Sequence, residues 1–285
     1  MKQNKKKLKL KKKVKRTLVL SFIFFIILMI NFNKLLLKTL TKYGNESINS
    51  VFFEVDDEIA EYKSTKSKSD TYDEIFKIRE EKNTNPIVYL YNTHQGEKYF
   101  KNDVFEPSII TATNYLKEKL NNLNINTIME KRSVSDVLSQ NGWSYGSSYR
   151  VSRSFLESTK NEFPTIKYYF DIHRDAGKKE STTLCVNDKC YAKLLFLVGL
   201  ENPNYAVTEE YAENLSARIN NKLKGLSKGI IQKQGQYVNG VYNEDFSNRL
   251  ILIEVGGENN TIEEVYNTVD ILSEVISDFI REDET

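Results

Sequence analysis

The sequence predicts an α/β fold with a mostly parallel, mixed sheet flanked by helices and preceded by one N-terminal transmembrane helix. From Pro86 onward, short apolar runs alternate with longer segments whose apolar residues recur at helical spacing. This alternation is typical of parallel sheets. The run Leu18–Phe32 is apolar apart from two residues, and it follows a lysine-rich start. That order is typical of a membrane anchor.

The N-terminal region divides into three predicted segments. Residues 1–16 form a basic arm with ten Lys or Arg and no acidic residue. Residues 17–37 form the anchor, because flanking residues extend the apolar run to the ~20 residues that a span needs. No small-residue cleavage site follows, which favours a retained anchor over a signal peptide. Residues 38–84 are polar and are expected to form a stalk.

Charge predicts the orientation and excludes one class of partner. The chain has 41 Lys or Arg and 39 Asp or Glu, which leaves 31 basic against 39 acidic residues after Arg16. Nucleic-acid binding needs a basic face on the folded part of a protein, so no nucleic-acid partner is expected. A basic arm before the span keeps the N-terminus in the cytoplasm. We therefore expect a single-pass protein of the cell membrane with an extracytoplasmic domain.

Residues 85–285 are predicted to form one domain. Strands are expected at Ile87–Tyr91, Ile125–Met129, Ile166–Ile172 and Leu250–Val255, which are short apolar runs. Helices are expected at Pro107–Leu123, Tyr149–Lys160, Thr208–Leu223 and after Thr261, which forms a capping box with Glu264. The segments Ser139–Ser148 and Gly225–Ser247 are expected to be loops, and Thr182–Val198 a hairpin.

The two cysteines lie in this hairpin region. Cys185 and Cys190 flank a predicted two-residue turn at Asn187 and Asp188. The hairpin places them opposite each other, where either a disulfide or two free thiols is consistent with the sequence.

Both histidines of the chain follow apolar strands. His94 comes just after the first predicted strand, and His173 just after the third. Ligands bind at the carboxyl ends of strands in open α/β sheets, so the two side chains are candidate metal ligands. Glu97 lies three residues after His94, and two His with one carboxylate is a common catalytic zinc set. Glu106, at the start of the first helix, is the rival third ligand.

Three further groups complete the predicted site. Glu254 lies within the last apolar strand, where a carboxylate is costly to bury unless it is functional, so we expect it to act as the general base. Arg174 is a candidate to hold a substrate carboxylate or to stabilise an oxyanion. Asp171 and Asp175 bracket His173 and are candidates to accept the second imidazole N–H of a zinc-binding histidine.

Three segments resemble those of the stage II sporulation protein P family. They are Thr93–Tyr99 (THQGEKY), Asp171–Asp175 (DIHRD) and Leu252–Gly257 (LIEVGG), and they occur in this order. The chain departs from the family pattern at Asn92, where a His often stands. The Gly225–Asn248 loop also looks divergent, which leaves its substrate contacts unassigned.

The resemblance implies a fold like that of zinc amidases and carboxypeptidases, with N-acetylmuramoyl-L-alanine amidase activity on peptidoglycan and a second activity on stem-peptide cross-links. It implies that His94, Glu97 and His173 hold Zn²⁺ and that Glu254 is catalytic. It also implies action during engulfment, with stage II sporulation proteins D and M as partners.

Two alternatives remain open at this point. A zinc carboxypeptidase-like enzyme that trims stem peptides would share every predicted ligand. A non-catalytic wall-binding scaffold would retain only the shape of the site. The bond that is cut and the oligomeric state do not follow from the sequence.

Overall fold

The computed structural model describes residues 85–101 and 106–284, which all lie in the second of two units of the chain, Phe76–Thr285. The predicted arm, anchor and stalk lie outside the described residues. None of the helices in the described part combines the length and the hydrophobicity that a bilayer crossing needs.

The described residues alternate between strands and helices, as the sequence predicts. The strands are β1 Val88–Tyr91, β2 Thr127–Met129, β3 Tyr168–Asp175, β4 Thr183–Val186, β5 Lys189–Ala192, β6 Leu194–Gly199, β7 Ser227–Lys233 and β8 Leu250–Gly257. The helices are α3 Ile109–Asn122, α4 Val134–Asn141, α5 Ser148–Glu162, α6 Lys179–Thr182, α7 Tyr205–Lys222 and α8 Ile262–Asp283. Two short 3₁₀ turns, η1 and η2, occupy Tyr145–Ser147 and Glu244–Phe246.

The main sheet has the strand order β2-β1-β3-β8-β6-β7. Neighbouring strands are parallel except for β6 and β8, which are antiparallel. The prediction of a mixed, mostly parallel sheet is therefore confirmed. Parallel strands joined by helical crossovers send their carboxyl ends to the same edge of a sheet.

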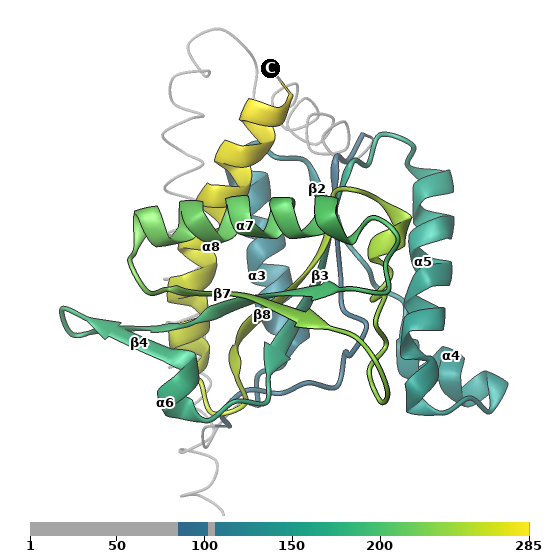
Figure 1. Ribbon diagram of the computed structural model, residues 1–285, viewed down its shortest axis with the longest axis horizontal. Helices are drawn as coiled ribbons and strands as arrows, with labels where there is room; N and C mark the ends of the chain where they lie inside the picture. The colour runs from purple at the N-terminus through teal and green to yellow at the C-terminus, as the bar shows by residue number, and fades with distance from the viewer. Residues whose placement is uncertain (1–84, 102–105, 285) are drawn as a thin grey trace, which may run out of the picture. The chain divides into compact units, whose positions relative to one another are not determined.

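Helices cover both faces of this sheet (Figure 1). On one face, apolar side chains of α3, α7 and α8 pack with alternate residues of the strands, including Phe170, Ile172 and Ile253. On the other face, Leu156 of α5 packs against Tyr89 and Tyr169. Because successive side chains of a strand point to opposite faces, the polar residues next to Ile172 and Ile253 face the side of α5.

Several elements of the structure were not predicted, among them the one-turn helix α6, the helix α4 and the strand β7. The helix α4 begins at Val134, and its N-cap Ser133 accepts a hydrogen bond from Asp136 N at 3.1 Å. The strand β7 lies inside the predicted Gly225–Ser247 loop and pairs with β6. Its apolar run, Ile230 and Ile231, is only two residues long, too short to stand out from the polar residues around it.

The predicted hairpin is shorter than expected. Only β4 and β5 form it, around Asn187 and Asp188 with φ of 50° and 60°, and β6 belongs to the main sheet. The hairpin projects at the left of Figure 1. Cys185 and Cys190 are direct cross-strand partners joined by a disulfide, which decides between the two states that the sequence left open.

The last helix begins with the predicted capping box. The Thr261 hydroxyl accepts from Glu264 N at 3.3 Å, and the Glu264 carboxylate accepts from Thr261 N at 2.9 Å. Two backbone donors at the start of α8 are therefore satisfied.

The Thr261→Ala variant should lower the free energy of unfolding by about 1 kcal/mol, because it removes the side-chain acceptor of the cap. Thr261→Ser keeps the hydroxyl and should stay close to the wild type. Urea denaturation of the three proteins measures the difference, and an equal loss in both variants would contradict a capping role.

Candidate functional site

Three neighbouring strands bring the candidate residues together. Parallel pairing aligns Tyr91 of β1 with Asp171 of β3, and His173 of β3 with Glu254 of β8. His94 follows β1 by three residues, and its ring centroid lies 5.2 Å from that of His173. Segments far apart in the sequence thus meet at the carboxyl ends of β1, β3 and β8, where the sequence places them.

The segment after β1 is a tight turn. Glu97 N donates to His94 O at 3.2 Å, and Glu97 O accepts from Ile109 N at the start of α3. This turn directs the Glu97 carboxylate towards β3, where its Oε2 accepts from Arg174 N at 3.0 Å and lies 3.6 Å from His173 Nδ1. The buried Asn92 is used elsewhere, since its amide donates to Ile172 O and to the Thr113 hydroxyl.

His173 lies between two carboxylates. Its Nε2 is 2.9 Å from Asp171 Oδ1, at an oblique angle, and its Nδ1 faces Glu97. Burial alone would lower the pKa of His173, but Asp171 and Glu97 outweigh it and raise this pKa well above its ordinary value in the metal-free protein. For His94, burial lowers the pKa and the neighbouring His173 lowers it further.

Glu254 is the carboxylate of the site whose environment is least favourable to charge. Its Oε2 is buried, and none of the residues that the structure describes forms a hydrogen bond with it. Burial raises the pKa of Glu254 to about 7, Glu97 and Asp175 add to the shift, and His173 and Arg174 oppose it. A carboxyl group with such a pKa can take up and release a proton near neutral pH.

The remaining predicted residues, Arg174, Asp175 and Glu106, differ in their hydrogen-bond and ion-pair partners. Nε of Arg174 is buried and has no hydrogen-bond partner within the described part of the chain, and the Arg174 backbone N–H donates to Glu97. Asp175 binds Lys228 Nζ at 2.7 Å and Gly177 N at 2.8 Å. Glu106 pairs with Lys98, which lowers the pKa of this exposed carboxyl. The structure thus places Glu97 beside His173, and Glu106 in a surface ion pair.

Two tyrosines contact His94. The Tyr145 ring stacks on the imidazole with centroids 4.6 Å apart, and the Tyr149 ring meets it edge-on at 5.4 Å. Tyr145 is 63% exposed. The sequence does not single them out, because 17 tyrosines give each one little weight. Their position, in η1 and at the start of α5 after a Ser/Gly-rich segment, is the only indication.

The donor set suits a metal although no cage is formed. Within residues 85–101 and 106–284, no three His, Cys, Asp or Glu side chains are arranged to hold a metal ion. The chemistry of the residues nonetheless fits zinc, because two imidazoles and a carboxylate adjoin one another. His94 Nδ1 and Glu254 Oε2 are buried polar atoms without a partner, a state that proteins rarely leave unexplained.

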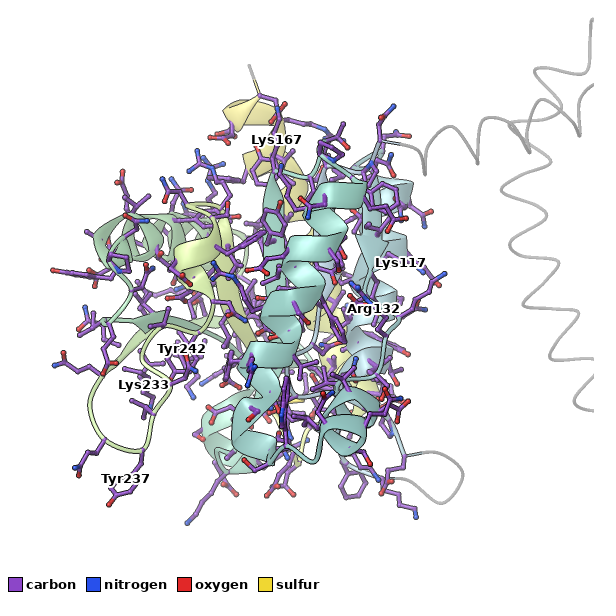
Figure 2. The ribbon with its side chains drawn as sticks, turned by 90° about the vertical axis from the view of Figure 1, so that its right-hand side faces the viewer. Lys117, Arg132, Lys167, Lys233, Tyr237 and Tyr242 are labelled. Carbon is purple, nitrogen blue, oxygen red and sulfur yellow. A yellow bond between two sulfur atoms is a disulfide. The ribbon has the colours of Figure 1, made fainter. Side chains whose placement is uncertain are left out.

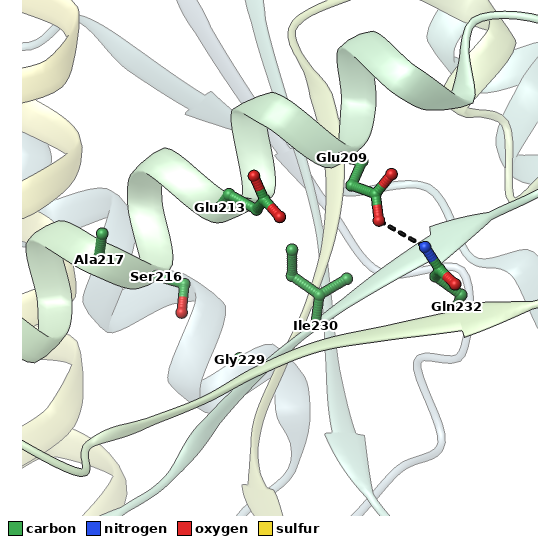
Figure 3. Close-up of a pocket in the computed structure, with 7 residues that line it drawn as sticks. All are labelled: Glu209, Glu213, Ser216, Ala217, Gly229, Ile230 and Gln232. Carbon is green, nitrogen blue, oxygen red and sulfur yellow. Dashed lines mark hydrogen bonds between the residues drawn. The ribbon is translucent and has the colours of Figure 1, made fainter.

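A separate pocket lies between α7 and β7 and has a volume of about 450 Å³ (Figure 3). Gln232 of the strand donates a hydrogen bond to Glu209 of the helix, and Glu213 lies above Ile230. None of its lining residues is a predicted site residue, so this pocket lies apart from the histidines.

Glu254 should make the stability of the metal-free protein depend on pH. Between pH 4.5 and about 7, the folded protein keeps a proton on Glu254 that the unfolded chain releases. The free energy of unfolding therefore falls as the pH rises through this window.

Glu254→Gln removes the titrating group. Between about pH 5 and pH 8, the free energy of unfolding of this variant should therefore fall less than that of the wild type, by a difference on the order of 2 kcal/mol. Urea denaturation with a chelator present measures both proteins. Parallel declines would show that Glu254 titrates normally.

Comparison with known proteins identifies the family. The family model described as stage II sporulation protein P matches residues 34–277. Stage II sporulation protein P of Bacillus subtilis (strain 168) is 29% identical over 202 residues, which are 67% of this chain and 50% of that protein. The chain thus spans about half the length of this curated relative.

A solved structure, Cwp6 from Clostridium difficile, is 18% identical and covers 68% of this chain and 29% of that one, with a TM-score of 0.41. This likeness is too weak to support an argument. The match of the family model over most of the sequence shows that the chain belongs to the stage II sporulation protein P family.

Proposed function

We propose that the protein is a membrane-anchored, zinc-dependent peptidoglycan hydrolase of sporulation. It cleaves the N-acetylmuramoyl-L-alanine amide bond and stem-peptide cross-links during engulfment, together with stage II sporulation proteins D and M. The catalytic domain faces the extracytoplasmic side of the cell membrane, and residues 17–37 anchor it.

One observation carries the proposal: β1, β3 and β8 gather two imidazoles, Glu97 and a protonatable Glu254 within one site. Family membership supports the substrate class and the sporulation context.

Each residue has a role that its surroundings suit. His94, Glu97 and His173 would hold the metal. When bound, zinc supplies Lewis-acid polarisation of the scissile carbonyl and a more acidic water. Glu254 takes the proton of the attacking water and returns it to the leaving amine, because its raised pKa makes both transfers accessible. Arg174, with its free Nε, neutralises negative charge on the substrate or on the developing oxyanion.

One alternative has an observation in its favour. The buried, unpartnered Nε of Arg174 could also clamp the free C-terminal carboxylate of a stem peptide, as in a carboxypeptidase-like enzyme. The two readings differ in product: an amidase separates the stem peptide from the glycan, whereas a carboxypeptidase releases single amino acids. A wall-binding scaffold would release neither.

The test compares the full-length protein with its His94→Ala, His173→Ala and Glu254→Gln variants. We expect one zinc per chain in the wild type and in Glu254→Gln, and loss of zinc from both His variants. Glu254→Gln should lower the rate of fragment release from purified peptidoglycan by about 10²- to 10⁴-fold, because it removes the general base. Metal analysis and mass spectrometry of the fragments measure these outcomes.

Glu106→Gln is the matched control, because it changes a carboxylate that the structure places in a surface ion pair. It should keep both zinc and activity. A wild type that binds no zinc and releases no fragment with zinc supplied would leave the scaffold reading in place.

A further inference from the structure

A chain of buried polar side chains runs from His173 to the segment after β7. The Asp171 carboxylate accepts from Thr93 N at 2.9 Å and from the Thr93 hydroxyl at 2.6 Å. The Thr93 hydroxyl also lies 2.8 Å from the Ser152 hydroxyl on α5. The Asn243 amide donates to Ser152 Oγ at 3.0 Å and to Tyr149 O at 3.1 Å. All these polar side chains are less than a tenth exposed.

The number of protons that each group can donate gives this series of hydrogen bonds a direction. A carboxylate can only accept and each hydroxyl has one proton, so Thr93 commits its proton to Asp171. The Ser152 hydroxyl has two acceptors within reach, the Thr93 hydroxyl at 2.8 Å and Tyr149 O at 3.2 Å, and it accepts from the Asn243 amide. The contact with Thr93 is the shorter one, so the hydrogen bonds run from Asn243 through Ser152 and Thr93 to Asp171. Nε2 of His173 lies 2.9 Å from Asp171 Oδ1, although the contact does not have the angle of a hydrogen bond.

We propose that Thr93, Ser152 and Asn243 are positioning residues that fix the Asp171 carboxylate beside Nε2 of His173 and thereby hold the imidazole with Nδ1 towards Glu97. The proposal deepens the proposed function, since it defines which imidazole atom serves the site. Substitution of any of the three residues loosens the carboxylate rather than removing a metal ligand.

The backbone conformation of Asn243 explains why an asparagine suits the last position in this series of hydrogen bonds. Its φ is 62°, and Asn adopts the left-handed region more readily than most residues. It follows a loop whose tip carries the fully exposed Tyr237 and whose base carries Tyr242 (Figure 2). The Tyr242 ring meets Tyr149, which meets His94. Tyr242 therefore reaches His94 through the Tyr149 ring, and Asn243 reaches Asp171 through Ser152 and Thr93.

The test observes His173 directly. The chain has only two histidines, so selective ¹⁵N labelling of histidine in the full-length protein in detergent gives two imidazole signal sets, and His94→Ala assigns them. In the metal-free wild type we expect a slowly exchanging His173 Nε2–H proton. In Thr93→Val, Ser152→Ala and Asn243→Gly this proton should exchange at least several-fold faster.

Zinc affinity gives a second readout. Thr93→Val should weaken zinc binding by about tenfold, because it removes a hydrogen bond to Asp171, the carboxylate next to the ligand His173. Ser152→Ala and Asn243→Gly are more distant from the zinc ligands and should weaken binding less. Asn243→Gly keeps the left-handed backbone accessible and removes only the amide. Ser154→Ala is the matched control, because the Ser154 hydroxyl lies on the same helix and donates to Val151 O one turn earlier in that helix.

The proposal is overturned if the three variants fold with wild-type melting curves and leave the exchange of His173 Nε2–H unchanged. It is also overturned if the His173 Nε2–H proton of the wild type exchanges as fast as that of an unprotected imidazole. Neither readout requires hydrolysis, so a protein without peptidoglycan activity would refute the proposed function and leave this inference standing or falling on the imidazole signals alone.

Discussion

The parallel pairing of β1, β3 and β8 is the constraint on which the site depends. Register aligns Tyr91 with Asp171 and His173 with Glu254, and side-chain alternation sends Asp171, His173 and Glu254 to the face of α5. A slip of one residue in β3 would turn His173 to the face of α3 and α8, where Ile172 packs. The apolar residues that fix the register therefore also fix the chemistry.

Two carboxylates on this face have opposite environments. Asp171 is fully buried but accepts hydrogen bonds from the Thr93 backbone N–H and from the Thr93 hydroxyl. Glu254 has a buried oxygen with no donor, and burial raises its pKa to about 7. The face of α5 thus carries one carboxylate held by hydrogen-bond donors and one, Glu254, that can exchange a proton near neutral pH.

Much of this arrangement could be predicted from the sequence. The apolar runs of β1, β3 and β8 are evident, and each is followed by, or contains, a residue of the site, so His94, His173 and Glu254 could be named in advance. The contacts of Ser152 and Asn243 could not be predicted. A single serine in a helix or a single asparagine in a polar segment does not belong to any sequence pattern that would indicate its partners. The strand β7 was not predicted for a related reason. Lys228, Gly229 and Gln232 limit its apolar run to two residues, and only its pairing with β6 identifies it as a strand.

The disulfide of the β4–β5 hairpin has a consequence for metal chemistry. Cys185 and Cys190 are the only cysteines of the chain and are bonded to each other. While the bond is intact, the protein offers no thiolate, the side chain that competes most strongly for soft and borderline metal ions. A zinc stoichiometry measured under non-reducing conditions therefore counts nitrogen and oxygen ligands alone, whereas a strong reductant would expose two sulfur ligands on the hairpin.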